Sequence, residues 1–568
     1  MRRKRLTAVV AVVAATVGAA AVPAAGNAAA RSAGAAAAQT GLLPGDRTAA
    51  YGPYGFTTHG LGKTDSYGEP SIAIAPDGIH TVISTPGGGG VQIWHSNDDG
   101  ASFAHTSTTS PNGGGDSEID FLPDGTLLSA DLEISDSDIK VSHDFGATWN
   151  AGTRAGTEMD RQWLAHSPDG KTQWLVYHDF AAEAELISTS TDGGLTWTTL
   201  PVQQKVVNSP SQAFALPGGL VAPAPGSTAP LADQDANTFS GPLLIDPDGK
   251  DQYVVYSISD LQSNLNPQDG VPPTGPVRGI VVAHSRDAGQ SWTNTYAVVA
   301  QPNVTDAAHE EQTGSLFPWG FIDPAGTVYV VFNSNRGNLG TDKFHTYYVF
   351  SKDKGAHWSK AVKLDDLPID SPGSALYNTG AAVKPGVVDF AWYQSDTTTP
   401  SQSTGTYVPH FAQVSAADTD SPKVVTQALT TVPNHHGGIC LQGILCGIGP
   451  GSADRSLLDF FELAVNPKTG LAEVAYADNA RLTPTGASSV TGEVVFATQT
   501  VAAPKVSKPP TKALGAKQAK HPATSPPKLT RPGGSLAATG GLPLAVLALL
   551  ATVLGLTTLR RRKQHRST

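Results

Sequence analysis

The stretch STDGGLTW at residues 190–197 decides the fold, because the chain repeats it. SHDFGATW stands at 142–149, SRDAGQSW at 285–292 and SKDKGAHW at 351–358, and a weaker copy, SNDDGASF, stands at 96–103. The serine and aspartate can accept backbone N–H groups inside a turn, and the glycine allows a backbone angle that other residues avoid. The final aromatic residue places a large apolar plate under the turn. Each copy therefore predicts a tight turn between two strands. Its structural residues are Asp98, Asp144, Asp192, Asp287 and Asp353, with Trp149, Trp197, Trp292 and Trp358.

A second pattern, a β-hairpin, lies upstream of each copy. EIDFLPDGTLLSADL (118–132) shows it well: an apolar strand, a Pro-Asp-Gly turn and a second apolar strand. Seven such hairpins occur, at 69–85, 118–132, 161–179, 241–258, 318–334, 378–396 and 457–478. No long amphipathic helix interrupts them, and the units recur at roughly 45 residues, which is typical of four-stranded propeller blades.

The sequence thus predicts an all-β chain with a single β-propeller over 56–501. Seven blades are expected. Six is the alternative, because the last two units lack the repeated phrase. The long gaps 198–240 and 416–456 are interpreted as loop insertions.

The phrase Ser-x-Asp-x-Gly-x-Thr-Trp resembles the Asp-box, or bacterial neuraminidase repeat, of sialidase-like propellers. The resemblance covers nearly all of 56–501, through the repeats and not through a catalytic motif. It implies that the Asp-boxes lie on a rim face, away from the catalytic mouth of the propeller.

Both ends of the chain predict export. Residues 1–30 have a basic start, an apolar run and a small-residue cleavage motif, as secretory signal peptides do. An N-terminal extension, 31–55, follows. At the other end, the Pro-, Lys- and Ala-rich stretch 502–535 predicts an extended linker.

The last segment, 536–568, resembles a Gram-positive sortase sorting signal of the actinobacterial type. It contains LAATG at 536–540, an apolar run at 542–559 and then RRRK. The resemblance implies that sortase cuts between Thr539 and Gly540, with Leu536 opening the motif, and joins the chain to the cell wall. The apolar run is long enough to cross a bilayer, so an ordinary C-terminal membrane helix is the alternative. Either interpretation places the bulk of the chain outside the cell, at the cell wall or cell surface.

Composition excludes some functions. The net charge is −11 and the basic residues concentrate at the two ends, so nucleic acid is not an expected partner. The two cysteines, Cys440 and Cys446, are predicted to form one disulfide in an exported protein. Asp98 and the run 134–138 have calcium-like spacing, but a calcium loop needs more converging carboxylates, so no cofactor is expected.

Chemistry is expected where the loops lead into the innermost strands, because propellers gather ligands at one end of the channel. These positions are polar in this chain. The candidates for catalysis are Glu311, Tyr377 and Asp160, and the candidates for ligand binding are Arg161, Arg336, Arg455, Glu69, Glu118 and Asp235. Each of them can instead cap a strand or join two blades through an ion pair.

A sialidase needs three arginines for the substrate carboxylate, a Tyr–Glu nucleophile pair and an acid/base aspartate. No arginine occurs between Arg47 and Arg154, where the first family arginine is expected. The favoured hypothesis is therefore an exported propeller that binds extracellular glycan or glycoprotein without sialidase catalysis. The alternatives are an exo-acting, sialidase-like glycoside hydrolase and a purely structural wall protein.

Overall fold

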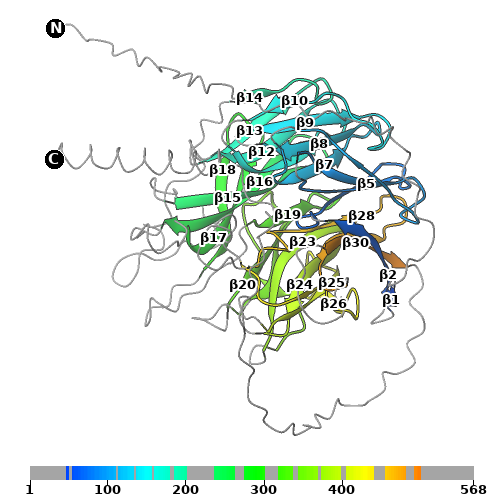
Figure 1. The fold of residues 1–568 in the computed structure, drawn as a ribbon. Helices are drawn as coiled ribbons and strands as arrows, with labels where there is room; N and C mark the ends of the chain where they lie inside the picture. The colour runs from blue at the N-terminus through cyan, green and yellow to red at the C-terminus, as the bar shows by residue number, and fades with distance from the viewer. Residues whose placement is uncertain are drawn as a thin grey trace, which may run out of the picture. The chain divides into compact units, whose positions relative to one another are not determined.

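Seven antiparallel sheets follow one another along the chain in the computed structural model, and together they form a seven-bladed β-propeller (Figure 1). The structure describes residues 47–49 and 54–500, apart from 65, 88, 111–112, 134–135, 157–158, 180–183, 201–235, 262–273, 301–316, 337–342, 369–371, 398–403, 441–453 and 482–491. These described residues contain no α-helix. The predicted all-β class and the seven blades are confirmed, and the six-bladed alternative is wrong.

The innermost strands form a closed series in which each contacts the next. They are β3 (Ser71–Ile74), β7 (Ser117–Phe121), β11 (Met159–His166), β15 (Ala236–Ile245), β19 (Trp319–Ile322), β23 (Ser374–Lys384) and β28 (Glu462–Val465). The second strands are β4 (Thr81–Thr85), β8 (Leu127–Leu132), β12 (Gln173–Asp179), β16 (Gln252–Leu261), β20 (Val328–Ser334), β24 (Val387–Ser395) and β29 (Ala472–Asp478).

The third strands are β5 (Gln92–Ser96), β9 (Ser137–Ser142), β13 (Ala184–Ser190), β17 (Thr274–Ser285), β21 (His345–Ser351), β25 (Thr406–Ser415) and β30 (Gly492–Thr500). The outer strands are β6 (Ala104–Ser107), β10 (Thr153–Ala155), β14 (Thr198–Leu200), β18 (Thr293–Val299), β22 (Val362–Lys363), β26 (Lys423–Ala428) and β2 (Gly55–Thr64). A short β27 (His435–His436) pairs with β25, and β1 (Arg47–Ala49), within the predicted extension 31–55, pairs with β2.

Burial follows the position of a strand within its blade. Every residue of β20 (VYVVFNS) and β29 (AEVAYAD) is buried, because a blade's middle strands pack against neighbouring blades on both faces. The outer strand β6 (AHTS) alternates between half-buried and exposed residues. The apolar runs of the sequence therefore mark middle strands, and the alternating or polar runs mark outer strands.

The seventh blade combines both ends of the propeller. Strands β28, β29 and β30 come from its C-terminal part, and β2 pairs antiparallel with β30, from Gly55 beside Thr500 to Thr64 beside Gly492. In Figure 1 the blue strand β2 lies next to the orange strand β30. The predicted hairpin at 457–478 corresponds to β28 and β29, whereas the completion of this blade by β2 was not predicted.

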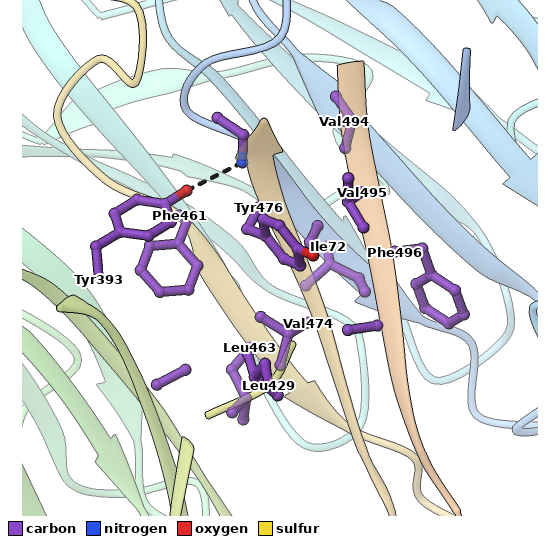
Figure 2. Close-up of a cluster of buried hydrophobic side chains, with 14 of the residues drawn as sticks. Ile72, Tyr393, Leu429, Phe461, Leu463, Val474, Tyr476, Val494, Val495 and Phe496 are labelled. Carbon is purple, nitrogen blue, oxygen red and sulfur yellow. Dashed lines mark hydrogen bonds between the residues drawn. The ribbon is translucent and has the colours of Figure 1, made fainter. Parts of the chain in front are cut away.

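A large hydrophobic cluster lies around this closing blade (Figure 2). Phe461 stacks on Tyr393 of blade 6 with 4.3 Å between ring centroids, and the backbone N–H of Ala477 donates to the Tyr393 hydroxyl at 3.0 Å. Ile72 of blade 1 and Tyr476 of blade 7 belong to the same cluster. Apolar packing therefore joins the last blade to both of its neighbours.

The five copies of the repeated phrase form the same turn between the third and fourth strands of their blades. In the copy at 190–197, the Ser190 hydroxyl donates to Asp192 at 2.8 Å and accepts the N–H of Gly194 at 3.0 Å. Asp192 also accepts the N–H and the hydroxyl of Thr196, at 2.9 and 2.6 Å. Asp98, Asp144, Asp287 and Asp353 make the corresponding bonds.

The tryptophans of the phrase pack inward from these turns. Trp197 and Trp292 donate their indole N–H to the carbonyls of Gly194 and Gly289, at 3.0 and 3.1 Å. The four tryptophans at the ends of the phrases are each packed against a hydrophobic cluster of the propeller: Trp149, Trp197, Trp292 and Trp358. The side chains of the phrase are thus occupied by local hydrogen bonds and core packing.

The buried hydroxyl of Ser190 provides a test of this structural role. Replacing Ser190 with alanine leaves the buried N–H of Gly194 without an acceptor, so we expect the free energy of unfolding to fall by about 1–2 kcal/mol. Urea denaturation measures this change. Ser421→Ala is the control, because the exposed Ser421 hydroxyl makes no hydrogen bond within the described part of the chain; its effect is expected to stay within about 0.5 kcal/mol. Equal stability of the Ser190 variant and the wild type would contradict the assignment.

The predicted signal peptide, linker 502–535 and sorting signal lie outside the described residues. Among the residues that are described, no helix is long and apolar enough to cross a membrane. Cys440 donates its backbone N–H to Asp454 at 2.8 Å, but Cys446 is outside the described part, so the disulfide stays a prediction.

Candidate functional site

The topology of the blades separates two faces of the propeller. Within an antiparallel blade, the turns after the first and third strands lie at one end, and the start of the first strand lies at the other. The repeated turns therefore lie opposite the positions where the inner strands begin. We call the second face the mouth face.

Backbone conformation singles out four residues at or beside the start of inner strands. Glu69, Arg161, Tyr377 and Leu458 have φ values of 51°, 41°, 52° and 57°, in the left-handed region that residues other than glycine seldom adopt. The strand pairing shifts register at Arg161 and again between Leu376 and Thr379. Such conformations cost free energy and persist only where surrounding contacts impose them, and they cluster at functional sites.

Six residues from five blades meet on the mouth face, and we call them the mouth cluster. They are Glu69 (blade 1), Asp116 (blade 2), Asp160 (blade 3), Tyr377 (blade 6), and Arg455 and Asp459 (blade 7). Glu69 and Asp459 are buried, whereas the other four are half-buried, although the hydroxyl oxygen of Tyr377 is itself buried. Residues far apart in sequence therefore present acidic, phenolic and guanidinium groups at one place.

A buried pair of carboxyl groups forms the centre of the mouth cluster. Glu69 accepts the backbone N–H of Asp459 at 3.0 Å and shares a hydrogen bond with the carboxyl group of Asp116. Burial, then the charges of Asp116 and Asp459, raise the pKa of Glu69 well above its ordinary value. Arg455 pairs with Asp459; burial opposes its charge, but Asp459 and Glu69 raise the pKa of Arg455. Glu69 and Asp116 therefore share a hydrogen bond in which the raised pKa of Glu69 favours its protonated form.

A second carboxyl pair lies around Arg161. The Arg161 guanidinium donates to Glu118 at 2.7 Å, lies 3.4 Å from Glu462, and donates to the carbonyls of Ser117 and Gln162. Burial and then the charge of Glu462 raise the pKa of Glu118 well above its ordinary value, so Glu118 holds the proton of the pair.

Arg161 is also held between two aromatic rings. Its guanidinium carbon lies 3.5 Å from the ring centre of Trp163 and 3.9 Å from that of Phe460. The side chain has no exposed surface, so a direct contact with a ligand requires these contacts to open. In this structure Arg161 joins blades 2, 3 and 7.

Asp160 is a half-buried acid of the mouth cluster whose pKa is raised. Burial, and then the charge of Asp116, raise the pKa of Asp160 to about 7. Its strand partner is His178, which hydrogen-bonds Glu185 at 3.2 Å. Burial opposes protonation of His178, but the bond to Glu185 and the charges of Glu185, Asp160 and Asp179 together outweigh burial and raise the pKa of His178. A half-buried carboxyl group that is neutral near pH 7 can donate a hydrogen bond or a proton.

Tyr377 faces the same cluster. Burial and then the charge of Asp459 raise the pKa of Tyr377 well above its ordinary value, so the phenol is neutral. Within the described residues its hydroxyl has no hydrogen-bond partner. Its predicted partner Glu311 lies outside the described part of the chain, as does Asp235.

The arginines of the predicted site are not arranged as a sialidase requires. Among the described residues, only Arg161 and Arg455 join the carboxyl groups of the two pairs, and each is already bound to carboxyl groups. Arg336 is half-buried just after β20, with its backbone N–H donated to Ser334 at 3.0 Å. The arrangement in the described part is therefore acidic and lacks a free three-arginine clamp.

Sequence reasoning missed three of the residues that organise the site, Asp116, Asp459 and Glu462. Asp116 precedes Glu118 by two residues, and the alternation of a strand places both on the same side of the start of β7. Asp459 and Glu462 are in the polar–apolar stretch DFFE, which reads as the start of an inner strand. These polar residues beside the inner strands are visible in the sequence, but they follow no spacing that would single them out as site residues.

A possible cation site lies on a turn at the opposite face. Asp246, Asp248 and Asp251 bring carboxylate oxygens within 4.8 Å of one another. Asp251 already contacts His284 at 2.5 Å, as well as Lys354 and Arg286. The negative charge of Asp251 is therefore already paired with the side chains of Lys354 and Arg286.

Comparison with known proteins gives distant matches among solved structures. No protein family and no curated protein matches the chain. Among solved structures, an alpha-L-arabinanase of Penicillium chrysogenum complexed with arabinobiose is 14% identical, covers 67% of this chain and 92% of its own, and has a TM-score of 0.34. A PL25 polysaccharide lyase, an ulvanlyase, is 10% identical over 79% of this chain and 95% of its own, with a TM-score of 0.41.

A Hadza microbial sialidase, Hz136, is a third match. It is 12% identical, covers 71% of this chain and 78% of its own, and has a TM-score of 0.28. These three structures, an arabinanase, a polysaccharide lyase and a sialidase, are distantly similar to the chain.

Proposed function

We propose that the chain is an exported, surface-anchored propeller that binds extracellular glycan at its mouth face, without sialidase catalysis. One observation carries this proposal: four half-buried side chains, Asp116, Asp160, Tyr377 and Arg455, come from four different blades to one place. Carboxyl, phenol and guanidinium groups are the hydrogen-bonding partners that sugar hydroxyls use. Export and anchoring rest on the two terminal sequence signals.

The charge of the mouth cluster indicates which class of sugar it can bind. Arg455 is bound to Asp459 and Arg161 is sealed between Glu118, Glu462 and two aromatic rings. Neither guanidinium is free for a substrate carboxylate, which a sialidase must clamp. A neutral sugar therefore suits the described residues better than an acidic one.

Asp160 provides the test of this proposal. The purified protein is first screened on a glycan array at pH 6, and affinity for the best neutral glycan is then measured by calorimetry. Replacing Asp160 with alanine removes a half-buried hydrogen-bonding group and is expected to weaken binding at least tenfold. Asp248→Asn, on a turn of the opposite face, is the control and is expected to bind as the wild type does. Wild-type affinity in both Asp160→Ala and Asp116→Ala would overturn the proposed site.

A second function, glycoside hydrolysis, is favoured by the raised pKa of Asp160. An acid with a pKa of about 7 is largely protonated below pH 7 and can protonate a leaving-group oxygen. Hydrolysis of fluorogenic neutral glycosides would then fall as the pH rises through 7, because the proton is lost. Asp160→Asn is expected to abolish turnover and retain binding. If none of the fluorogenic glycosides is hydrolysed, hydrolysis is contradicted and only the binding function is retained.

A further inference from the structure

The boundary between blade 7 and blade 1 is where the propeller closes. Blade 7 is completed by β2, and the chain then passes through residues 66–70 into β3 of blade 1. We call the contacts between β28–β29 and blade 1 the closing seam. Three buried glutamates carry polar contacts across it: Glu69, Glu462 and Glu473, with 1%, 5% and 2% of their surface exposed.

Glu462 holds the start of the first blade from the last. One of its carboxylate oxygens accepts both the Ser71 hydroxyl at 2.7 Å and the backbone N–H of Ile72 at 3.0 Å. The charged and titratable groups that face it are Glu118 of blade 2 and Arg161 of blade 3. The inner strand of blade 1 therefore depends on an acceptor that belongs to blade 7.

Glu473 makes a corresponding contact nearer the opposite face. It accepts the Thr81 hydroxyl of blade 1 at 2.9 Å and the Asn466 side-chain amide at 3.1 Å. The same amide donates to the carbonyl of Gly78 at 2.9 Å. Asp99 of blade 1 is the charged group that faces Glu473.

Glu69 crosses the seam in the other direction, from blade 1 to the N–H of Asp459 in blade 7 at 3.0 Å. Asp116, Asp459 and Arg455 face it, and Tyr377 of blade 6 lies near. Most of these polar contacts are made to carboxyl groups. Among the described residues, Arg161 and Arg455 are the cations that face these carboxyl groups.

We propose that the closing seam is an alkali-sensitive latch, in which Glu69, Glu462 and Glu473 hold the last blade on the first while the buried acids of the seam keep their protons. Two pairs, Glu69–Asp116 and Glu118–Glu462, each hold one proton between two carboxyl groups. Removal of that proton places two negative charges together in a buried site, which is strongly unfavourable.

The direction of the pH effect follows from the protonation states. Burial raises the pKa of Glu473 to about 7 and that of Glu69 well above its ordinary value. In the unfolded chain these acids ionise near pH 4 to 5, so at pH 4 and below both states are protonated and no penalty exists. As the pH rises above about 5, the unfolded or opened state loses protons first, so opening of the seam becomes easier until the pH passes the raised pKa values of the folded state.

Hydrogen exchange on the full-length protein tests the latch. After correction for the intrinsic rates, exchange of the amides of β3 and β28 is expected to be at least tenfold faster, relative to pH 6, when measured at pH 9. The amides of β19 and β23, at the boundary between blades 5 and 6, are the internal control. In that boundary Asp323 accepts the N–H of Gly386 at 3.0 Å, and no second carboxyl group bonds Asp323 within the described residues.

Glu473→Gln gives a second measurement. The amide oxygen still accepts from Asn466 but the group cannot ionise, so protection around Thr81 at pH 9 is expected to exceed that of the wild type at least tenfold, with little difference at pH 4. Equal protection of the seam at pH 6 and 9 in the wild type would overturn the latch. So would a loss of protection that is the same in all blades. These outcomes do not depend on whether the protein binds glycan.

Discussion

Replacing Arg161 with alanine is expected to lower the free energy of unfolding by about 3–5 kcal/mol. The substitution removes the only cation that faces Glu118 and Glu462 among the described residues, and it leaves Glu462 as a buried charge without its partner. It also removes the group held between the Trp163 and Phe460 rings. Urea denaturation followed by tryptophan fluorescence measures the change.

Two variants make this result specific. Arg154 also pairs with two acids, Glu133 and Asp136 at 2.9 Å each, but its side chain is 61% exposed. Arg154→Ala is therefore expected to leave the denaturation midpoint unchanged within error. Arg161→Lys keeps the charge but loses the planar guanidinium, which stacks on the aromatic rings and forms several hydrogen bonds at once. It is therefore expected to recover only part of the stability. An Arg161→Ala protein as stable as the Arg154 variant would contradict a role in joining the blades.

The second large effect is expected at Phe461. Its side chain is fully buried and stacks on Tyr393 at 4.3 Å within the cluster of Figure 2. Phe461→Ala removes a large apolar surface and leaves a cavity, so the free energy of unfolding is expected to fall by about 3–5 kcal/mol. Phe461 also lies between Asp459 and Glu462 in the chain, so glycan affinity is expected to fall with stability.

Leu195→Ala is the matched control for Phe461→Ala. Leu195 is a large apolar side chain on a repeated turn, but it is 50% exposed, so its loss is expected to cost less than about 0.5 kcal/mol. Thermal denaturation of the three proteins side by side separates a general loss of apolar surface from the loss of core packing. A Phe461 variant with wild-type stability would mean that the cluster tolerates a cavity without penalty.

Much of the fold could be predicted from short stretches of sequence, because the turns and hairpins are formed by residues close together in the chain. The phrase at 190–197 is a closed set of hydrogen bonds among Ser190, Asp192, Gly194 and Thr196, so the residues that specify the turn are also the residues that make it. The hairpins are similarly local, since a Pro-Asp-Gly turn and two apolar strands suffice. A count of these units predicted seven blades, and the structure has seven.

Only part of the candidate site could be predicted from the sequence. Glu69, Asp160, Tyr377 and Arg455 were singled out because polar residues precede the inner strands, and the structure brings them together. Arg161 was singled out by the same reasoning, but its side chain is sealed between aromatic rings, which no local pattern indicates. Asp116, Asp459 and Glu462 were missed because their importance depends on partners in other blades.

The closing of the ring was also not predicted. Strand β2 resembles any other strand of the chain, and its pairing with β30 joins residues more than 400 positions apart. Whether such a pairing forms depends on how many blades fit around the channel, which is a property of the whole ring.

The sequence by itself determined the repeated unit and its turns, because each rests on contacts between residues close in the chain, and the count of these units favoured seven blades over six. Only the tertiary structure decided which acids share protons, which arginine is buried and where the first and last blades join. Those features depend on desolvation and on charges from several blades, and both arise only when the ring is complete.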